Sequence, residues 1–70
     1  MHYLTLTVHA GYIQWVVSVE DGANGGLKVI ASGSDPNLEN TTYGTATLDV
    51  IGRLVDLYGG LVDIDIIHAD

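Results

Sequence analysis

The stretch from residue 48 to residue 67 constrains the fold more than any other part of this sequence. It reads as an amphipathic helix, a glycine pair at Gly59 and Gly60, and a strand in which apolar and acidic residues alternate. Glycine ends helices because it adopts the left-handed conformation without a Cβ clash. Only two residues separate helix and strand, so the helix must pack back over the sheet that this strand joins.

Apolar residues at spacings of three and four predict the buried stripe of the helix. They are Leu48, Ile51, Leu54, Val55 and Tyr58. Arg53 lies on the opposite stripe and is predicted to pair with Asp49 and Asp56. Gly52 predicts a close approach of the helix to the sheet. The candidate N-caps are three threonines, with the helix starting near the last of them: Thr41, Thr42 and Thr45.

Period-two alternation predicts four strands, at residues 3–9, 12–20, 27–32 and 61–67. Glycine-rich or tight connections join the first three strands into a meander of antiparallel hairpins. Residues 33–44 are expected to form a long loop with a turn at residues 34–37. The inward apolar positions of the four strands are predicted to be Leu4, Leu6 and Val8; Ile13, Trp15, Val17 and Val19; Leu27, Val29 and Ala31; and Val62, Ile64 and Ile66.

These elements predict an α+β fold in the order βββαβ, with residues 1–70 as a single domain. The last strand most simply lies parallel to the first, which gives a four-stranded mixed sheet of order 3-2-1-4 with a right-handed crossover. One helix covers one face of that sheet. The opposite face, called the open face below, is predicted to carry Tyr3, Thr5, Thr7, His9, Tyr12, Gln14, Val16, Lys28, Ile30, Ser32, Asp63, Asp65 and Ile67.

The charge of the chain narrows the classes of partner. Nine acidic residues against two basic ones give a formal net charge of −7, and the acids are spread along the whole sequence. Such a surface repels nucleic acid and anionic membranes, so neither is an expected partner. Solubility is the simpler explanation of the charge, and recognition of a basic protein surface is the more specific one. The residues expected to bind such a partner are Glu20, Asp21, Asp35, Glu39, Asp63, Asp65, Tyr3 and Tyr12.

The usual catalytic residue sets are missing from the sequence. There is no Cys, no nucleophile-elbow serine and no phosphate-binding loop. Asp63 and Asp65 would lie about 7 Å apart on one face of a strand. Two solvated carboxylates are the simpler interpretation of this spacing, and an acid–base pair is the alternative. His9 and His68 end adjacent strands near Asp70, but alternation points the two imidazoles to opposite faces. We therefore expect no enzyme activity, cofactor or metal.

Two resemblances add to this reading. The βββαβ order, with residues 40–43 (Asn-Thr-Thr-Tyr) leading into the helix and residues 66–70 (Ile-Ile-His-Ala-Asp) closing the last strand, resembles the first half of the ribonuclease H-like fold. That family binds two metal ions through an Asp in the first strand, a Glu early in the helix and an Asp after the fourth strand. Here the first position offers Thr5 or Thr7, the second offers Thr45 or Thr47, and only Asp70 matches the third. The resemblance thus implies the fold and not the metal-dependent activity.

In size and acidity the chain also resembles small phage proteins that block host defence, such as anti-CRISPR proteins. Together these features predict a non-enzymatic inhibitor that covers a basic, nucleic-acid-binding surface of a partner protein. The alternative is a small self-assembling module that forms a homodimer through its open face, centred on Tyr3, Tyr12, Val16 and Ile30. The N-terminus shows no signal peptide and no apolar run reaches membrane-spanning length, so we expect a cytoplasmic location, in the host cell if a phage encodes it.

Overall fold

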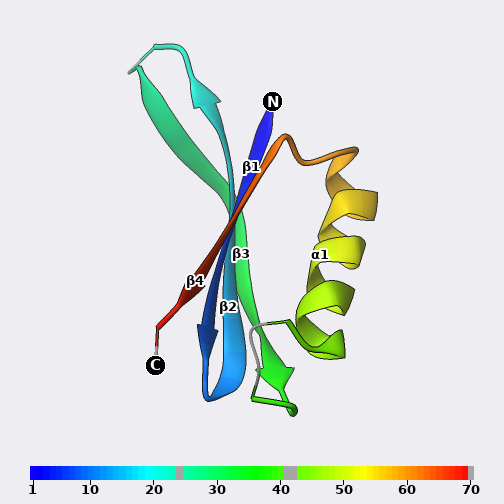
Figure 1. Ribbon diagram of the computed structural model, residues 1–70. Coiled ribbons are helices and arrows are strands. Elements are labelled where there is room, and N and C mark those ends of the chain that lie inside the picture. Colours follow the sequence, from blue (N-terminus) through cyan, green and yellow to red (C-terminus); the bar gives the residue numbers. More distant parts are fainter. Residues whose placement is uncertain (24, 41–42, 70) are drawn as a thin grey trace.

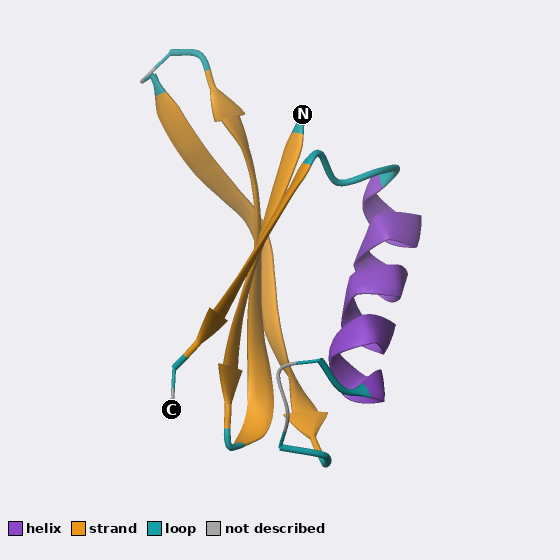
Figure 2. Cartoon of the chain, in the orientation of Figure 1, coloured by secondary structure: helices purple, strands orange, loops and turns teal. Residues whose placement is uncertain are grey.

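One helix packs on one face of a four-stranded sheet in the computed structural model, which describes residues 1–23, 25–40 and 43–69 (Figure 1; Figure 2). The chain order is β1 (His2–His9), β2 (Gly11–Asp21), β3 (Gly26–Asn37), α1 (Thr45–Tyr58) and β4 (Asp63–His68). The sheet order is β3-β2-β1-β4, with β1 antiparallel to β2, β2 antiparallel to β3, and β4 parallel to β1. The predicted α+β class, element order and strand order are confirmed.

The core lies between the helix and the inward residues of β1 and β2. Register places each inward residue of β1 beside one of β2, so that Leu4 pairs with Val17, Leu6 with Trp15, and Val8 with Ile13. On the side of α1 that faces the sheet, the buried residues are Thr47, Val50 and Leu54. The fully buried apolar residues are Leu4, Leu6, Val8, Ile13, Val17, Val50 and Leu54, and Trp15, Ala31, Ile51, Tyr58 and Ile66 pack around them.

Strand β3 is twice as long as predicted. It continues through Asn37, and residues 33–37 pair with residues 11–15 of β2 instead of forming a loop and turn. The turn signal of Ser-Asp-Pro-Asn is overridden because the long strand β2 offers ladder partners back to Gly11. Pro36 is tolerated because β3 is an edge strand, where a missing N–H need not break the ladder.

A one-residue register shift in β3 changes which side chains face the core. Ala31 pairs with Val17 but Val29 pairs with Ser18, so Ile30 is an extra residue, as in a β-bulge. The prediction that Leu27 and Val29 face the core is therefore wrong: they are 59% and 58% exposed and share the open face with Glu20 and Ser18. Lys28 was predicted on the open face, and this is also wrong, because Lys28 pairs with Val19 on the helix side of the sheet.

The helix is rotated relative to the predicted stripe. Leu54, Ile51 and Tyr58 pack on the core as expected, but Leu48 is 62% exposed and Val50 takes its place. Gly44 is the N-cap residue and Thr45 is the first helical residue, so the prediction of Thr45 as a cap is wrong. The other two predicted caps, Thr41 and Thr42, lie outside the described residues. Gly59 ends the helix in the left-handed conformation and donates its N–H to the Val55 carbonyl, as predicted.

Two further expectations fail at the surface. Val62 precedes β4 and is 60% exposed, so it does not join the core. A Cβ added to Gly52 would meet no atom within 4 Å, so this glycine does not mark a close approach to the sheet. Within the described part of the chain, no helix is long and apolar enough to cross a bilayer.

Candidate functional site

The open face of the sheet carries a group of carboxylates around Tyr3. In the parallel register of β4 on β1, Asp63 lies beside Tyr3 and Asp65 beside Thr5. From the other side, Glu20 of β2 reaches Tyr3, whose hydroxyl donates to Glu20 Oε1 at 2.6 Å. Glu20, Asp63 and Asp65 are all exposed, and we call them the open-face acids. Alternation predicted the face of each of the three, and β1 brings them to one end of the sheet.

The pKa of Tyr3 reports the negative field at this place. The hydrogen bond to Glu20 raises the pKa of the Tyr3 phenol most strongly, desolvation raises it next, and the charges of Glu20 and Asp63 raise it further. The hydrogen bond and the charges act in the same direction because ionising Tyr3 would add a negative charge beside carboxylates. Glu20 and Asp63 therefore act together on Tyr3, which lies between them.

Neither base of the chain neutralises the open-face acids. Arg53 points from α1 to Asp35 of β3, with 2.6 Å between Nη2 and Oδ2. Lys28 lies on the helix side of the sheet because of the register shift at Ile30. Among the described residues, no ion pair involves the open-face acids. The predicted pairing of Arg53 with Asp49 and Asp56 is replaced by the bond to Asp35, and Asp49 acts on Arg53 only through its charge.

Asp35 was predicted as a partner-binding residue, but its carboxylate is already engaged on the helix side. Trp15 Nε1 donates to Asp35 Oδ2 at 2.9 Å, and the same oxygen accepts from Arg53. The hydrogen bond from Arg53 lowers the pKa of Asp35, partial burial opposes this, and the Trp15 bond adds to the lowering. This group ties β2, β3 and α1 together, so its evident role is structural. Sequence spacing gives no signal for it, because three separate elements contribute.

Two other predicted residues serve the local chain geometry. Glu39 Oε1 accepts the Ala46 N–H at 3.1 Å, so this carboxylate caps the first turn of α1 in place of the N-cap glycine. Asp21 Oδ1 accepts the Ala23 N–H at 3.2 Å in the turn between β2 and β3. Their charges add to the surface potential, but they are not gathered with the open-face acids.

Tyr12 lies at the opposite end of the open face from the acids. Its ring stacks on His9 with 4.3 Å between centroids and 8° between planes. His9 Nε2 also lies 2.9 Å from Gln14 Oε1. Register puts His68 beside Val8 on the helix side, so the predicted divergence of the two histidines is confirmed. In the described ranges no group of three or more His, Asp or Glu side chains could hold a metal ion.

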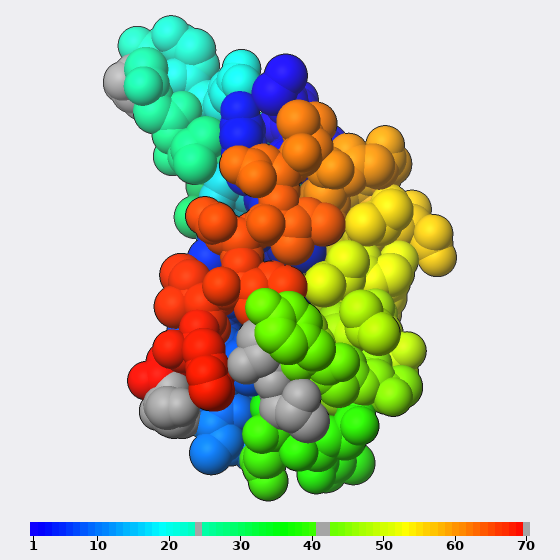
Figure 3. All heavy atoms as spheres, viewed as in Figure 1, coloured from blue at the N-terminus to red at the C-terminus, as the bar shows by residue number. Residues whose placement is uncertain are grey.

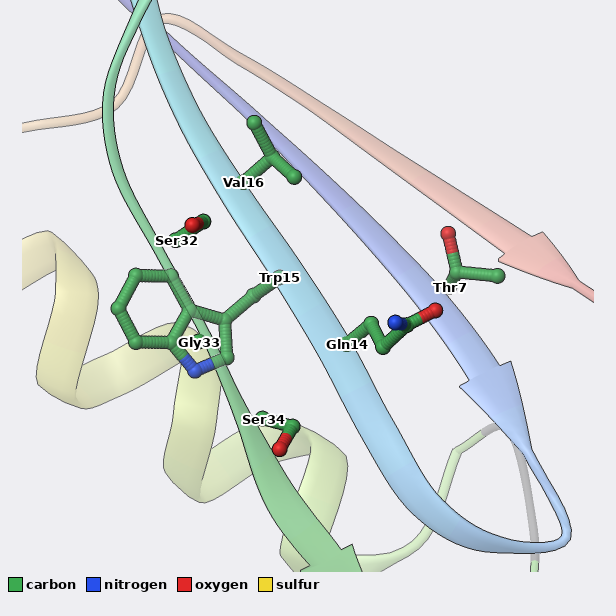
Figure 4. A pocket seen from close by; sticks show the side chains of 7 residues that line it. All are labelled: Thr7, Gln14, Trp15, Val16, Ser32, Gly33 and Ser34. Atoms are coloured by element: carbon green, nitrogen blue, oxygen red, sulfur yellow. The ribbon is translucent and has the colours of Figure 1, made fainter.

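A shallow hollow of about 420 Å³ lies in the middle of the sheet, at its β3 side. Thr7, Gln14, Val16, Ser32 and Ser34 point into it, and Trp15 and Gly33 complete its lining (Figure 4). The short side chains of Ser32 and Ser34 leave this space open, whereas the space next to Gly33 on the helix side is filled by the Trp15 ring. None of the lining residues titrates near neutral pH, so the hollow offers hydrogen bonds but no acid, base or nucleophile set.

No protein-family model and no curated protein matches the sequence. Among solved structures, the chain is similar to the Aquifex aeolicus member of the Ppx/GppA protein family, with a TM-score of 0.69 and 9% identity. The match covers 97% of this chain and 26% of that one, so the chain spans about a quarter of that protein's length. At this identity the likeness shows the fold alone, and it agrees with the four-stranded sheet and single helix described above.

Proposed function

We propose that the protein is a non-enzymatic, acidic binding module that covers a basic surface of a partner protein. One observation carries the proposal: Glu20 and Asp63 flank Tyr3, Asp65 lies beside Thr5, and the described residues of this sheet face include no Lys or Arg. Carboxylates without a neighbouring Lys or Arg attract a cationic surface, speed its association and disfavour acidic partners. A surface that binds nucleic acid has the required charge, so the module would compete with nucleic acid for it.

The positions of the acids support a smaller set of proposed contact residues. Of the six acids expected from the sequence, Glu20, Asp63 and Asp65 share one face, whereas Asp35 is paired with Arg53. Tyr3 lies between the open-face acids and would contact the partner with them. An anti-CRISPR type of phage inhibitor is the specific form of this proposal that size and acidity favour.

The test is affinity capture at low ionic strength, followed by competition. Immobilised protein should retain basic nucleic-acid-handling proteins, and soluble protein should displace a labelled oligonucleotide from them. The Asp63→Asn/Asp65→Asn variant should lose most of this displacement. The control variant Asp49→Asn/Asp56→Asn removes the same charge from the exposed side of α1 and should keep it. Displacement should weaken with added salt, because exposed charges are screened beyond about 8 Å at physiological ionic strength. Retention of neutral or acidic proteins only, or equal loss in the two variants, would contradict the proposal.

Exposed apolar residues on the same face support the alternative of a homodimer. Leu27, Val29 and Ile67 lie on the open face by register, and Tyr12 is also exposed. A symmetric dimer would bury these side chains, although each copy brings a charge of −7 to the contact. Light scattering over a range of concentration and salt tests this function. Dimerisation that becomes tighter with added salt supports the homodimer, and a monomer at high concentration contradicts it.

A further inference from the structure

The outer edge of β4 is the feature that the proposed function leaves unused. Among the described residues, β4 ends the sheet and pairs with β1 alone. In Figure 3 the orange-red to red atoms of β4 are visible at the front of the molecule. An edge strand presents unpaired N–H and C=O groups that can form a ladder with another extended chain.

The two edges of this sheet differ in how they are protected. β3, the other edge, contains Lys28, Pro36 and the extra residue Ile30, all devices that hinder the pairing of edge strands. β4 has the sequence Asp-Ile-Asp-Ile-Ile-His, with no Pro, Gly, Lys or register shift. Its only protective groups are two carboxylates. The β4 edge is therefore the one open to a further strand.

Backbone directions identify the groups that would bond to that strand. In a parallel ladder, alternate residues direct both backbone groups to the same neighbour. The Ala69 N–H donates to the Val8 carbonyl at 3.0 Å, so within β4 the residues of the same parity, Asp65 and Ile67, face β1. The N–H and C=O groups of Ile64 and Ile66 consequently point away from the sheet.

The charge on β4 decides between two occupants of this edge. In a symmetric antiparallel pair of β4 strands centred on residue 65, the two copies of Asp65 would lie directly opposite each other, and like charges in that position are destabilising. The whole-chain charge of −7 opposes such pairing in any register. A strand with Lys or Arg opposite Asp63 and Asp65 instead gains opposite-charge pairs on the open face. The same carboxylates thus exclude a second copy and select a cationic segment.

We propose that β4 binds an extended basic segment of the partner as a fifth strand of the sheet. Lys or Arg at alternate positions of the segment would lie over Asp63 and Asp65 on the open face. β-Branched or aliphatic residues between them would pack beside Ile64, which is 38% exposed, on the helix side. The inference rests on the proposed function, since it specifies how a basic partner is held.

Three synthetic peptides of equal charge test the proposal by NMR titration at low ionic strength. The first is the alternating peptide Lys-Val-Lys-Val-Lys-Val, the second is the block peptide Lys-Lys-Lys-Val-Val-Val, and the third is the alternating peptide with N-methylated valines. We expect the alternating peptide to bind most tightly and to slow hydrogen exchange at the Ile64 and Ile66 amides. Methylation should abolish this protection because it removes backbone donors and keeps the charge. The Asp63→Asn/Asp65→Asn variant should bind the alternating peptide about 2- to 30-fold more weakly, and the Asp49→Asn/Asp56→Asn variant should bind it as the wild type does.

The outcomes separate this inference from the proposed function. If the three peptides bind equally and no β4 amide gains protection, the acidic face attracts cations but strand addition is wrong. If no peptide binds, both proposals fail. If the Ile64 and Ile66 amides are already protected without peptide in a dimeric protein, a second copy occupies the edge and the proposal is overturned.

Discussion

The substitution Gly33→Ala should destabilise the protein because of the ring that lies over Gly33. A Cβ built on Gly33 would stand 2.6 Å from Trp15 Cζ2 and 2.9 Å from Cε2. Carbon atoms in normal contact are about 3.5–4.0 Å apart, so the indole ring would have to move by about 1 Å. The ring is held in place by the hydrogen bond from its Nε1 to Asp35, which also accepts from Arg53. Moving the ring therefore strains that bond.

The expected cost follows from two opposing effects. Overpacking of this kind costs about 1–3 kcal/mol. Loss of glycine freedom in the unfolded chain returns about 0.4–1 kcal/mol. The net loss of about 1–2 kcal/mol should lower Tm by about 5–15 °C in a chain of this length. Urea unfolding followed by circular dichroism measures the same difference as a shift of the midpoint at constant m-value.

A double-mutant cycle identifies the ring as the cause. Trp15→Leu removes all three indole atoms nearest to the added Cβ, so in that background Gly33→Ala should lose its cost and stabilise by about 0.4–1 kcal/mol through the unfolded chain. The matched control is Gly52→Ala, where nothing lies within 4 Å of the added atom and alanine favours the helix interior by about 1 kcal/mol. The same chemical change should thus have opposite signs at the two glycines. An equal cost of Gly33→Ala with and without Trp15 would refute the reasoning.

Three further predictions concern single carboxylates. The folded-state pKa of Asp35 is lowered, so its contribution to stability is complete above its ordinary pKa of 3.8 and is lost as the pH falls through the folded value. Asp35→Asn should therefore cost about 0.2–1 kcal/mol at neutral pH, and acid denaturation should show this difference shrinking below the ordinary pKa. As a control, Asp56→Asn on the exposed side of α1 should cost less than Asp35→Asn at neutral pH. Glu20→Gln should bring the titration of Tyr3, followed by NMR of the ring carbons, back toward 10.0, and Glu39→Gln should leave it unchanged. Glu39→Ala should destabilise the protein by about 0.5–2 kcal/mol through loss of a helix cap. Glu39→Gln keeps an acceptor for the Ala46 N–H and should cost less. Equal costs of the two substitutions would argue against capping.

Patterns contained within one strand gave the reliable part of the fold prediction. Period-two alternation set the inward faces of β1 and β2, and the short glycine connection forced α1 back over the sheet. The errors occur where a distant segment decides. β3 extends to Asn37 because β2 provides partners for it, and the extra residue Ile30 leaves no mark in the local sequence. Arg53 bonds to Asp35, a residue far away in sequence, in preference to the neighbouring acids on its own helix.

The candidate site was predictable to a similar extent. Asp63 and Asp65 were placed on the open face by alternation alone, and the register confirms that face. The bond between Tyr3 and Glu20 was missed, although both residues were predicted to point outward on adjacent strands of one hairpin. Counting residues back from the turn would have brought the two within reach. No comparable signal exists for the engagement of Asp35 with Trp15 and Arg53.

The register shift in β3 links the fold to the proposed function. With unbroken alternation Lys28 would lie on the open face, one strand away from Glu20, and a base there would partly cancel the field around Tyr3. The extra residue Ile30 places Lys28 beside Val19 on the helix side, and the network on Asp35 holds Arg53 on that side as well. Both bases of the chain are therefore kept from the face that gathers Glu20, Asp63 and Asp65. The chain carries a net charge of −7 spread over several elements, and this backbone leaves the three acids of the open face without a base beside them, next to the edge of β4.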